Sequence, residues 1–157
     1  IRGDTKYLEL LNTYRSSPEI IDYTNKILNL SHVNAIRRDN NKPVVIRKGV
    51  TDLKKRLIED INYLQKEYKS TAIITKDNRE AEEIYKLIKD DLNCSLVGAN
   101  SKVFKKDLVI IPAYVSKGLE FDSVIIYNDR NNSYKKNERN LLYVACTRCQ
   151  HELFIYN

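Results

Sequence analysis

The decisive stretch of the chain reads Leu-Val-Ile-Ile at residues 108–111, Lys-Gly-Leu-Glu-Phe-Asp at 117–122 and Val-Ile-Ile at 124–126. The two apolar runs are short and rich in β-branched residues, which is typical of strands buried on both faces of a parallel sheet. The loop between them carries a lysine, a glycine and a carboxylate. Because open α/β sheets place their ligands at such loops, any nucleotide that this protein binds is expected near Glu120.

Strand-like and helical patterns alternate on both sides of this stretch. Strands are expected at 43–46, 71–75, about 94–97, 108–112, 123–127 and 152–156, and helices from Pro18 to about Asn29, from Asp52 to about Tyr68, from Asn78 to Leu92 and from Glu138 onward. The segments 30–42, 98–107 and 128–137 are polar and irregular, and we expect loops there. This alternation predicts an α/β fold with a mostly parallel sheet flanked by helices.

The composition limits the class of protein. The 157 residues are 42% hydrophobic, enough for one core, so a single domain spanning 1–157 is expected. No apolar segment is long enough to cross a bilayer, and an odd count of three cysteines favours a reducing compartment, so we expect a cytoplasmic protein without a membrane partner. Methionine is absent even at position 1, which leads us to expect a fragment of a longer chain.

The net charge of +6 favours an approach to nucleic acid, but the lysines are scattered over several expected helices. The basic triplet at residues 54–56, for example, is most simply the solvated face of a helix. A stand-alone nucleic-acid-binding module is therefore one hypothesis that rests on charge alone.

Two kinds of site are disfavoured by the residues themselves. The chain has only four glycines and no Gly-x-x-x-x-Gly-Lys-Ser/Thr segment, so it has no phosphate loop of its own. Cys146, Cys149 and His151 offer at most three metal ligands, and we expect the two cysteines to be small side chains packed at a helix end. We therefore expect no metal site in this chain.

Three segments carry the candidate functional residues. They read Asn-Thr-Tyr-Arg-Ser-Ser at 12–17, Lys-Gly-Leu-Glu-Phe-Asp-Ser-Val at 117–124 and Leu-Leu-Tyr-Val-Ala-Cys-Thr-Arg at 141–148. Arg15 and Arg148 are each expected at the end of a regular element, where a guanidinium can project to a site outside the domain. In this order the three segments resemble motifs IV, V and VI of the superfamily-one helicases of the UvrD/Rep type.

The resemblance implies that the chain is the second, C-terminal RecA-like domain of such a motor. In that family ATP lies between two RecA-like domains, and the N-terminal one supplies the phosphate loop and the ligands of Mg²⁺. The resemblance implies that Tyr14 stacks on the adenine and that Arg15 and Arg148 contact the γ-phosphate. It also implies that Glu120 binds the ribose, with Gly118 allowing close approach of the backbone.

Arginines supplied across such an interface stabilise the charge that develops during phosphoryl transfer, an effect of roughly 10³ to 10⁵ in rate. The full-length protein would then be an ATP-dependent DNA helicase or translocase. The isolated fragment would be inactive.

One segment, Pro112-Ala-Tyr-Val-Ser-Lys117, departs from the family's usual pattern. Where the helicases carry Thr-x-His to hold single-stranded DNA, this chain has Pro112 and Tyr114, and only residues 93–107 stand where classical members insert a large accessory subdomain. These features, with Cys-Thr-Arg-x-x-His-Glu-Leu at 146–153, resemble the HelD-like (helicase IV-like) branch, which includes motors that act on RNA polymerase. Remodelling of RNA polymerase without unwinding is thus the alternative function.

Tyr114, Ser116 and Lys117 are the expected nucleic-acid contacts, with DNA as the expected partner. The Tyr114 ring either stacks on a base, worth roughly 1 to 3 kcal/mol, or packs against the end of the sheet. The sequence leaves both interpretations open.

Overall fold

The computed structural model describes residues 12–13, 17–20, 22–23, 34–35, 42–98, 107–128, 135 and 138–156. Within this part, six strands form one sheet in the order β3-β8-β7-β4-β6-β5, and all neighbouring strands are parallel. The strands are β3 (Val45–Arg47), β4 (Thr71–Thr75), β5 (Ser95–Leu96), β6 (Leu108–Pro112), β7 (Phe121–Tyr127) and β8 (Cys149–Tyr156). The predicted α/β fold is confirmed.

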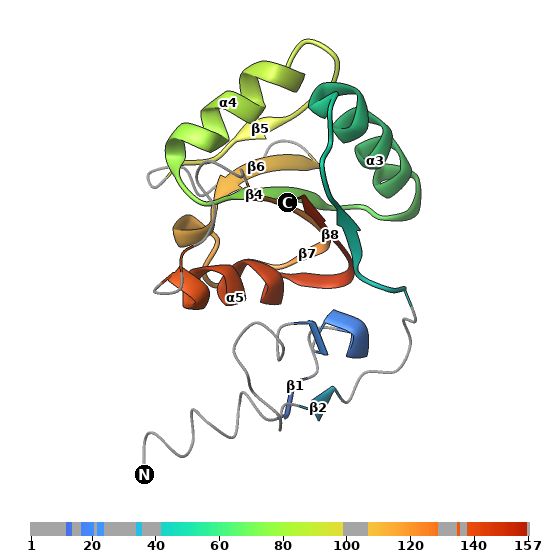
Figure 1. Ribbon diagram of the computed structural model, residues 1–157, viewed down its shortest axis with the longest axis vertical. Coiled ribbons are helices and arrows are strands. Elements are labelled where there is room, and N and C mark those ends of the chain that lie inside the picture. Colours follow the sequence, from blue (N-terminus) through green and yellow to red (C-terminus); the bar gives the residue numbers. More distant parts are fainter. Residues whose placement is uncertain are drawn as a thin grey trace.

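Helices connect the strands and cover both faces of the sheet (Figure 1). They are α3 (Leu53–Glu67), α4 (Asn78–Ile88), the short 3-10 helix η1 (Ala113–Val115) and α5 (Arg139–Thr147). Figure 1 shows α3 and α4 on one face and α5 on the other. No helix in the described ranges is long and apolar enough to span a membrane.

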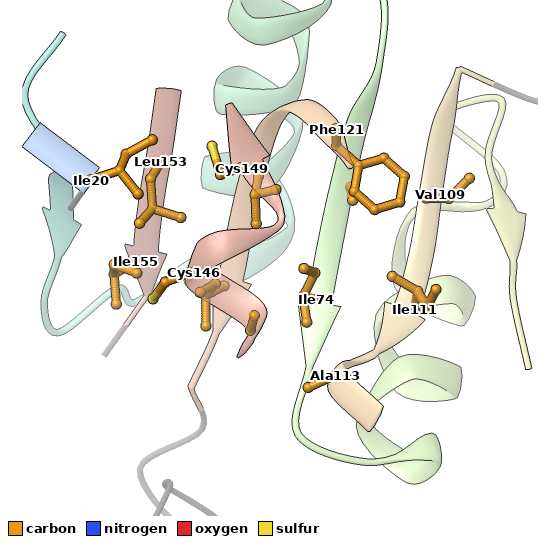
Figure 2. Packing of buried hydrophobic residues seen from close by; sticks show 14 of the residues in the cluster. Ile20, Ile74, Val109, Ile111, Ala113, Phe121, Cys146, Cys149, Leu153 and Ile155 are labelled. Atoms are coloured by element: carbon orange, nitrogen blue, oxygen red, sulfur yellow. The ribbon is translucent and has the colours of Figure 1, made fainter. Parts of the chain in front are cut away.

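The alternation of side chains along the strands divides the core in two. On the face of α3 and α4, Ile73, Ile110 and Ile125 pack against Leu57 of α3 and Ile84 of α4. On the opposite face, a second cluster packs against α5 and includes Ala72, Ile74, Val109, Ile111, Val124, Ile126, Leu153 and Ile155 (Figure 2). Burial of each valine, leucine or isoleucine side chain contributes roughly 1.5 to 3 kcal/mol, so the central strands contribute much of the stability of the fold.

Local sequence signals explain where the helices begin. The Asp52 carboxylate accepts a hydrogen bond from the Lys55 backbone N–H at 3.2 Å, and the Asp77 carboxylate accepts one from the Glu80 N–H at 2.9 Å. Both aspartates are N-caps, which satisfy backbone donors that have no partner inside the helix. α4 therefore begins directly after β4, and its first turn lies at the carboxyl edge of the sheet.

Several element boundaries differ from the sequence-based expectation. α4 ends at Ile88 rather than near Leu92, and β7 begins at Phe121 rather than at residue 123. β8 begins at Cys149 rather than at 152, so α5 stops at Thr147. The expected loop 30–42 contains a two-residue strand, β2 (Asn34–Ala35), which pairs in parallel with β1 (Asn12–Thr13).

The N-terminal part contributes to the second core cluster. Residues 18–20 and 22–23 are helical, within the helix expected from Pro18, and Ile20 is fully buried beside Leu153 and Ile155 (Figure 2). Tyr14 and Arg15 lie outside the described residues, so the roles expected for them stay predictions.

Candidate functional site

The loop from β6 to β7 carries most of the predicted site residues and crosses from one edge of the sheet to the other. It starts with η1 at the carboxyl end of β6 and reaches the amino end of β7 at Glu120. The crossing is required because β6 and β7 are both parallel to β4, so each must start at the same edge. Only the first part of this loop therefore lies at the carboxyl edge, where open sheets usually bind ligands. Glu120 lies at the opposite edge.

Local hydrogen bonds fix the course of this loop. The Ser116 hydroxyl is buried and donates to the Ala113 carbonyl at 2.6 Å, and the Leu119 N–H donates to the Ser116 carbonyl at 3.0 Å. Gly118 has a φ of +81°, a conformation that side chains other than glycine rarely adopt, although a Cβ there would meet no atom within 4 Å. Backbone conformation, and not crowding, therefore explains this glycine.

Two of the predicted nucleic-acid contacts, Ser116 and Lys117, lie in this loop. Lys117 is exposed, but the Ser116 side chain is buried and its hydroxyl is used to close the η1 turn. In this conformation Ser116 has no exposed hydroxyl to offer a ligand.

The amino edge brings Glu120 and Arg148 together. The Phe121 N–H donates to the Arg148 carbonyl at 2.9 Å, which joins the start of β7 to the start of β8. The Glu120 carboxylate accepts a hydrogen bond from the Gln150 amide at 2.6 Å. Two predicted site residues that are far apart in the sequence are thus neighbours in the fold.

Arg148 is the C-cap of α5, as predicted from its place at the end of an element, but its side chain does not project away from the helix. Its Nε donates to the Val144 carbonyl at 3.2 Å, and a terminal nitrogen donates to the Thr147 hydroxyl at 3.2 Å. The last carbonyls of a helix attract cations, which explains this conformation. To reach a ligand outside the domain, the guanidinium has to leave the last turn of α5.

The carboxyl edge carries Tyr114. Its side chain is 44% exposed, and its hydroxyl exchanges hydrogen bonds with the Asn78 amide at 2.9 and 3.1 Å. The hydroxyl end of the ring is therefore held beside the first turn of α4. This exposure leaves a ring surface that can accept a stacked base.

A nearby ion pair joins the start of α5 to the loop after β4. Lys76 Nζ lies 3.0 Å from Glu138 Oε1, and both side chains are partly buried. The hydrogen bond from Lys76, together with one from the Lys135 backbone N–H, lowers the pKa of Glu138 below its ordinary value. Glu138 is therefore ionised at neutral pH, and the carboxyl edge has a fixed charge pair.

The two C-terminal cysteines are structural. Cys146 and Cys149 are fully buried in the α5-side cluster and form no disulfide (Figure 2). Burial raises the pKa of both thiols, which keeps them protonated and weak as ligands or nucleophiles. In the described part of the chain, no three His, Cys, Asp or Glu side chains are placed to hold a metal ion.

The structure adds residues that sequence reasoning missed. Gln150 was missed because β8 was expected to begin at residue 152, although the chain already pairs with β7 from Cys149. Asn78 and Lys76 were hidden because their roles depend on Tyr114 and Glu138, to which no sequence spacing connects them. The Asp-Asn start signal of α4 was the available hint that polar groups gather there.

Known proteins show the same fold and, in one segment, the same sequence pattern. Residues 107–156 match the model of the UvrD-like helicase C-terminal domain. A search of curated proteins gives no significant match.

Two solved structures are similar over most of the chain. The C-terminal domain of a possible DNA helicase from Lactobacillus plantarum WCFS1 is 29% identical, with a TM-score of 0.73 over 92% of this chain and 86% of that one. T. fusca Cas3, solved with ATP, is 15% identical, with a TM-score of 0.51 over 79% of this chain and 19% of that one. The chain thus has the α/β fold of helicase RecA-like domains, and its C-terminal third, residues 107–156, matches the UvrD-like helicase C-terminal domain.

Proposed function

We propose that this chain is the C-terminal motor domain of an ATP-dependent superfamily-one DNA helicase or translocase. In this proposal ATP binds between the amino edge of this sheet and a second RecA-like domain of the same protein. That second domain supplies the Mg²⁺ ligands and the phosphate loop, a motif that this sequence lacks. Tyr14 contacts the adenine.

The observation that carries the proposal is that the backbones of Glu120 and Arg148 lie at the adjoining starts of β7 and β8, joined by the bond from the Phe121 N–H to the Arg148 carbonyl. A carboxylate accepts hydrogen bonds from ribose hydroxyls, and a guanidinium binds phosphate oxygens. Glu120 holds the ribose, and Gly118 lets the backbone approach it. Arg148, together with Arg15, stabilises the charge that develops on the γ-phosphate during hydrolysis.

The nucleic acid binds at the other edge. Tyr114 stacks on a base, and the exposed ammonium of Lys117 contacts a phosphate. The Ser116 hydroxyl is buried, so any contribution from this residue comes through the η1 turn that it closes.

The test compares the full-length protein with chain 1–157 alone. The full-length protein should hydrolyse ATP, and single-stranded DNA should stimulate it, because both halves of the ATP site are present. Chain 1–157 should show no turnover, since it has no phosphate loop. Turnover by the isolated chain at the full-length rate would contradict the proposal.

One observation favours a second function, remodelling of RNA polymerase by a HelD-like motor without strand separation. α4 ends at Ile88 and β6 begins at Leu108, with β5 between them, so there is no room here for the large accessory subdomain of the classical helicases. A strand-separation assay beside a polymerase pull-down on the full-length protein distinguishes the two. Polymerase binding without strand separation supports the second function, and the reverse supports the first.

A further inference from the structure

The start of β8 contains a β-bulge beside the predicted ribose contact. Between the pairs Phe121↔Cys149 and Ser123↔Glu152, the chain advances by two residues on β7 and by three on β8. The extra residue lies in the segment 150–151. Bulges redirect side chains and are frequent next to functional sites.

The two residues of this segment have different partners: Gln150 contacts Glu120, and His151 contacts Tyr68 and Asp122. The Gln150 amide, on β8, donates to Oε2 of Glu120, the residue before β7, at 2.6 Å. The His151 ring stacks on Tyr68 with the centroids 5.8 Å apart, and its Nε2 lies 4.0 Å from Asp122 Oδ1. The Tyr68 hydroxyl in turn donates to the buried Glu152 at 2.9 Å. The bulge is therefore anchored on the α3 side.

We infer that Gln150 is a positioning residue that orients the Glu120 carboxylate and so sets the preference of the site for a ribose over a deoxyribose nucleotide. This inference rests on the proposed function, in which Glu120 holds the ribose. The Glu120 side chain is exposed, and an exposed carboxylate samples several rotamers. The neighbouring His151 is held against Tyr68, which fixes the backbone from which Gln150 projects, and the hydrogen bond from its amide favours one Glu120 rotamer before the nucleotide binds, which lowers the entropy lost on binding.

The chemistry of the pair is compatible with this role. A carboxylate has two oxygens with about four lone pairs, so the bond from Gln150 to one oxygen allows a ribose hydroxyl to donate to the same carboxylate. The pair lies at the surface, where a single hydrogen bond adds little to folding stability. Its loss should therefore change nucleotide selectivity much more than stability.

The experiment measures steady-state hydrolysis of ATP, 2′-deoxy-ATP and 3′-deoxy-ATP by the full-length protein. Gln150→Leu replaces the amide with an apolar side chain of similar volume. It should raise KM for ATP by about three- to tenfold and leave kcat within about twofold, because a ground-state contact is weakened. The same substitution should leave KM unchanged for whichever deoxy analogue lacks the hydroxyl that Glu120 contacts. The ratio of kcat/KM for ATP to kcat/KM for that analogue, which measures the preference for ATP, should therefore fall.

Two further variants make the result specific. Gln150→Lys keeps a donor for Glu120 and should restore the preference. Gln65→Leu, on the exposed face of α3, is the matched control and should change neither constant nor preference. Melting temperatures show whether each variant is folded.

The outcomes separate the inference from the proposed function. If Glu120→Gln lowers the preference for ATP and Gln150→Leu does not, the positioning role is overturned and the proposed function stands. If neither variant changes it, the ribose role of Glu120 fails as well. A parallel loss of melting temperature and kcat in Gln150→Leu, with the preference unchanged, would also overturn the inference.

Discussion

The two edges of the sheet hold their polar side chains in different ways. At the amino edge, the Arg148 guanidinium donates to the last turn of its own helix, and the Glu120 carboxylate accepts a hydrogen bond from Gln150 of the adjoining strand. At the carboxyl edge, the pairs Tyr114–Asn78 and Lys76–Glu138 each join different elements of the fold. The Arg148 guanidinium is therefore held within one helix turn, whereas the two pairs at the carboxyl edge connect elements that are distant in the sequence.

The loop between β6 and β7 reaches both edges of the sheet. Residues 113–120 are continuous in sequence, but they begin at the end of β6 and finish at the start of β7. Strands of five to seven residues separate the two edges by roughly 16 to 23 Å. In the proposed function, this single segment would contribute to the nucleotide site at one edge and to the nucleic-acid site at the other.

Truncation of a buried side chain in the central sheet should cause the largest loss in the free energy of unfolding, because both edges are part of this sheet. Ile125 of β7 is fully buried, and Ile125→Ala should lower the free energy of unfolding of chain 1–157 by about 2 to 5 kcal/mol. Ile46, which is 44% exposed, is the matched control, and Ile46→Ala should cost less than about 1 kcal/mol. Urea unfolding measures both, and equal losses would contradict the assigned core.

A change at the carboxyl edge should affect nucleic-acid binding alone. Tyr114→Ala should raise the Kd of the full-length protein for a single-stranded oligonucleotide by about 5- to 150-fold, because a stacked ring is lost. Tyr114→Phe keeps the ring and loses only the two hydrogen bonds with Asn78, so its effect should be smaller.

The matched control for Tyr114 is Tyr63, an exposed tyrosine on α3. Tyr63→Ala should leave the Kd unchanged, and neither variant should change KM for ATP. If Tyr63→Ala weakens oligonucleotide binding as much as Tyr114→Ala does, the carboxyl edge is not the binding surface.

The smallest effect is expected from the ion pair that ties the carboxyl edge together. Because Lys76 lowers the pKa of Glu138 below its ordinary value of 4.5, the ionised form is favoured in the folded state. This contribution to stability is present above pH 4.5 and is lost as the pH falls through the lowered pKa. Glu138→Gln should therefore lower the melting temperature at pH 7, and this deficit should shrink as the pH falls below 4.5 and through the lowered pKa.

Glu83→Gln is the matched control for this measurement. Its partner is Arg79, and both side chains are more than half exposed, so its loss should lower the melting temperature at pH 7 less than Glu138→Gln does. A Glu138→Gln deficit that persists unchanged at low pH would show that the ion pair is not its cause.

The sequence predicted the elements whose signals are local. The boundaries of β4 and β6 agree with the expectation to the residue, because both are uninterrupted buried apolar runs. The start of β8 was missed because a bulge breaks its alternation at residues 150–151. β2 was missed because a two-residue strand depends on its partner β1 rather than on its own composition.

For the candidate site, the sequence predicted which residues belong to it, but not their side-chain conformations or hydrogen-bond partners. Glu120 and Arg148 follow from motif resemblance, and their adjacency follows only from the pairing of β7 with β8. The folded-back guanidinium of Arg148 and the buried hydroxyl of Ser116 depend on side-chain geometry in a helix turn and a tight loop. No sequence spacing encodes these contacts, nor the bond between Gln150 and Glu120.

The most direct test of the account is ATP turnover by full-length protein that carries Arg148→Ala, with ATP binding measured on the same sample. We predict a loss of roughly 10³-fold or more in kcat with binding retained, because the guanidinium acts on charge that develops during phosphoryl transfer. Arg139→Ala, which removes an exposed arginine at the other end of α5, should leave turnover unchanged. Near-normal turnover by Arg148→Ala would contradict the assignment of the amino edge to ATP.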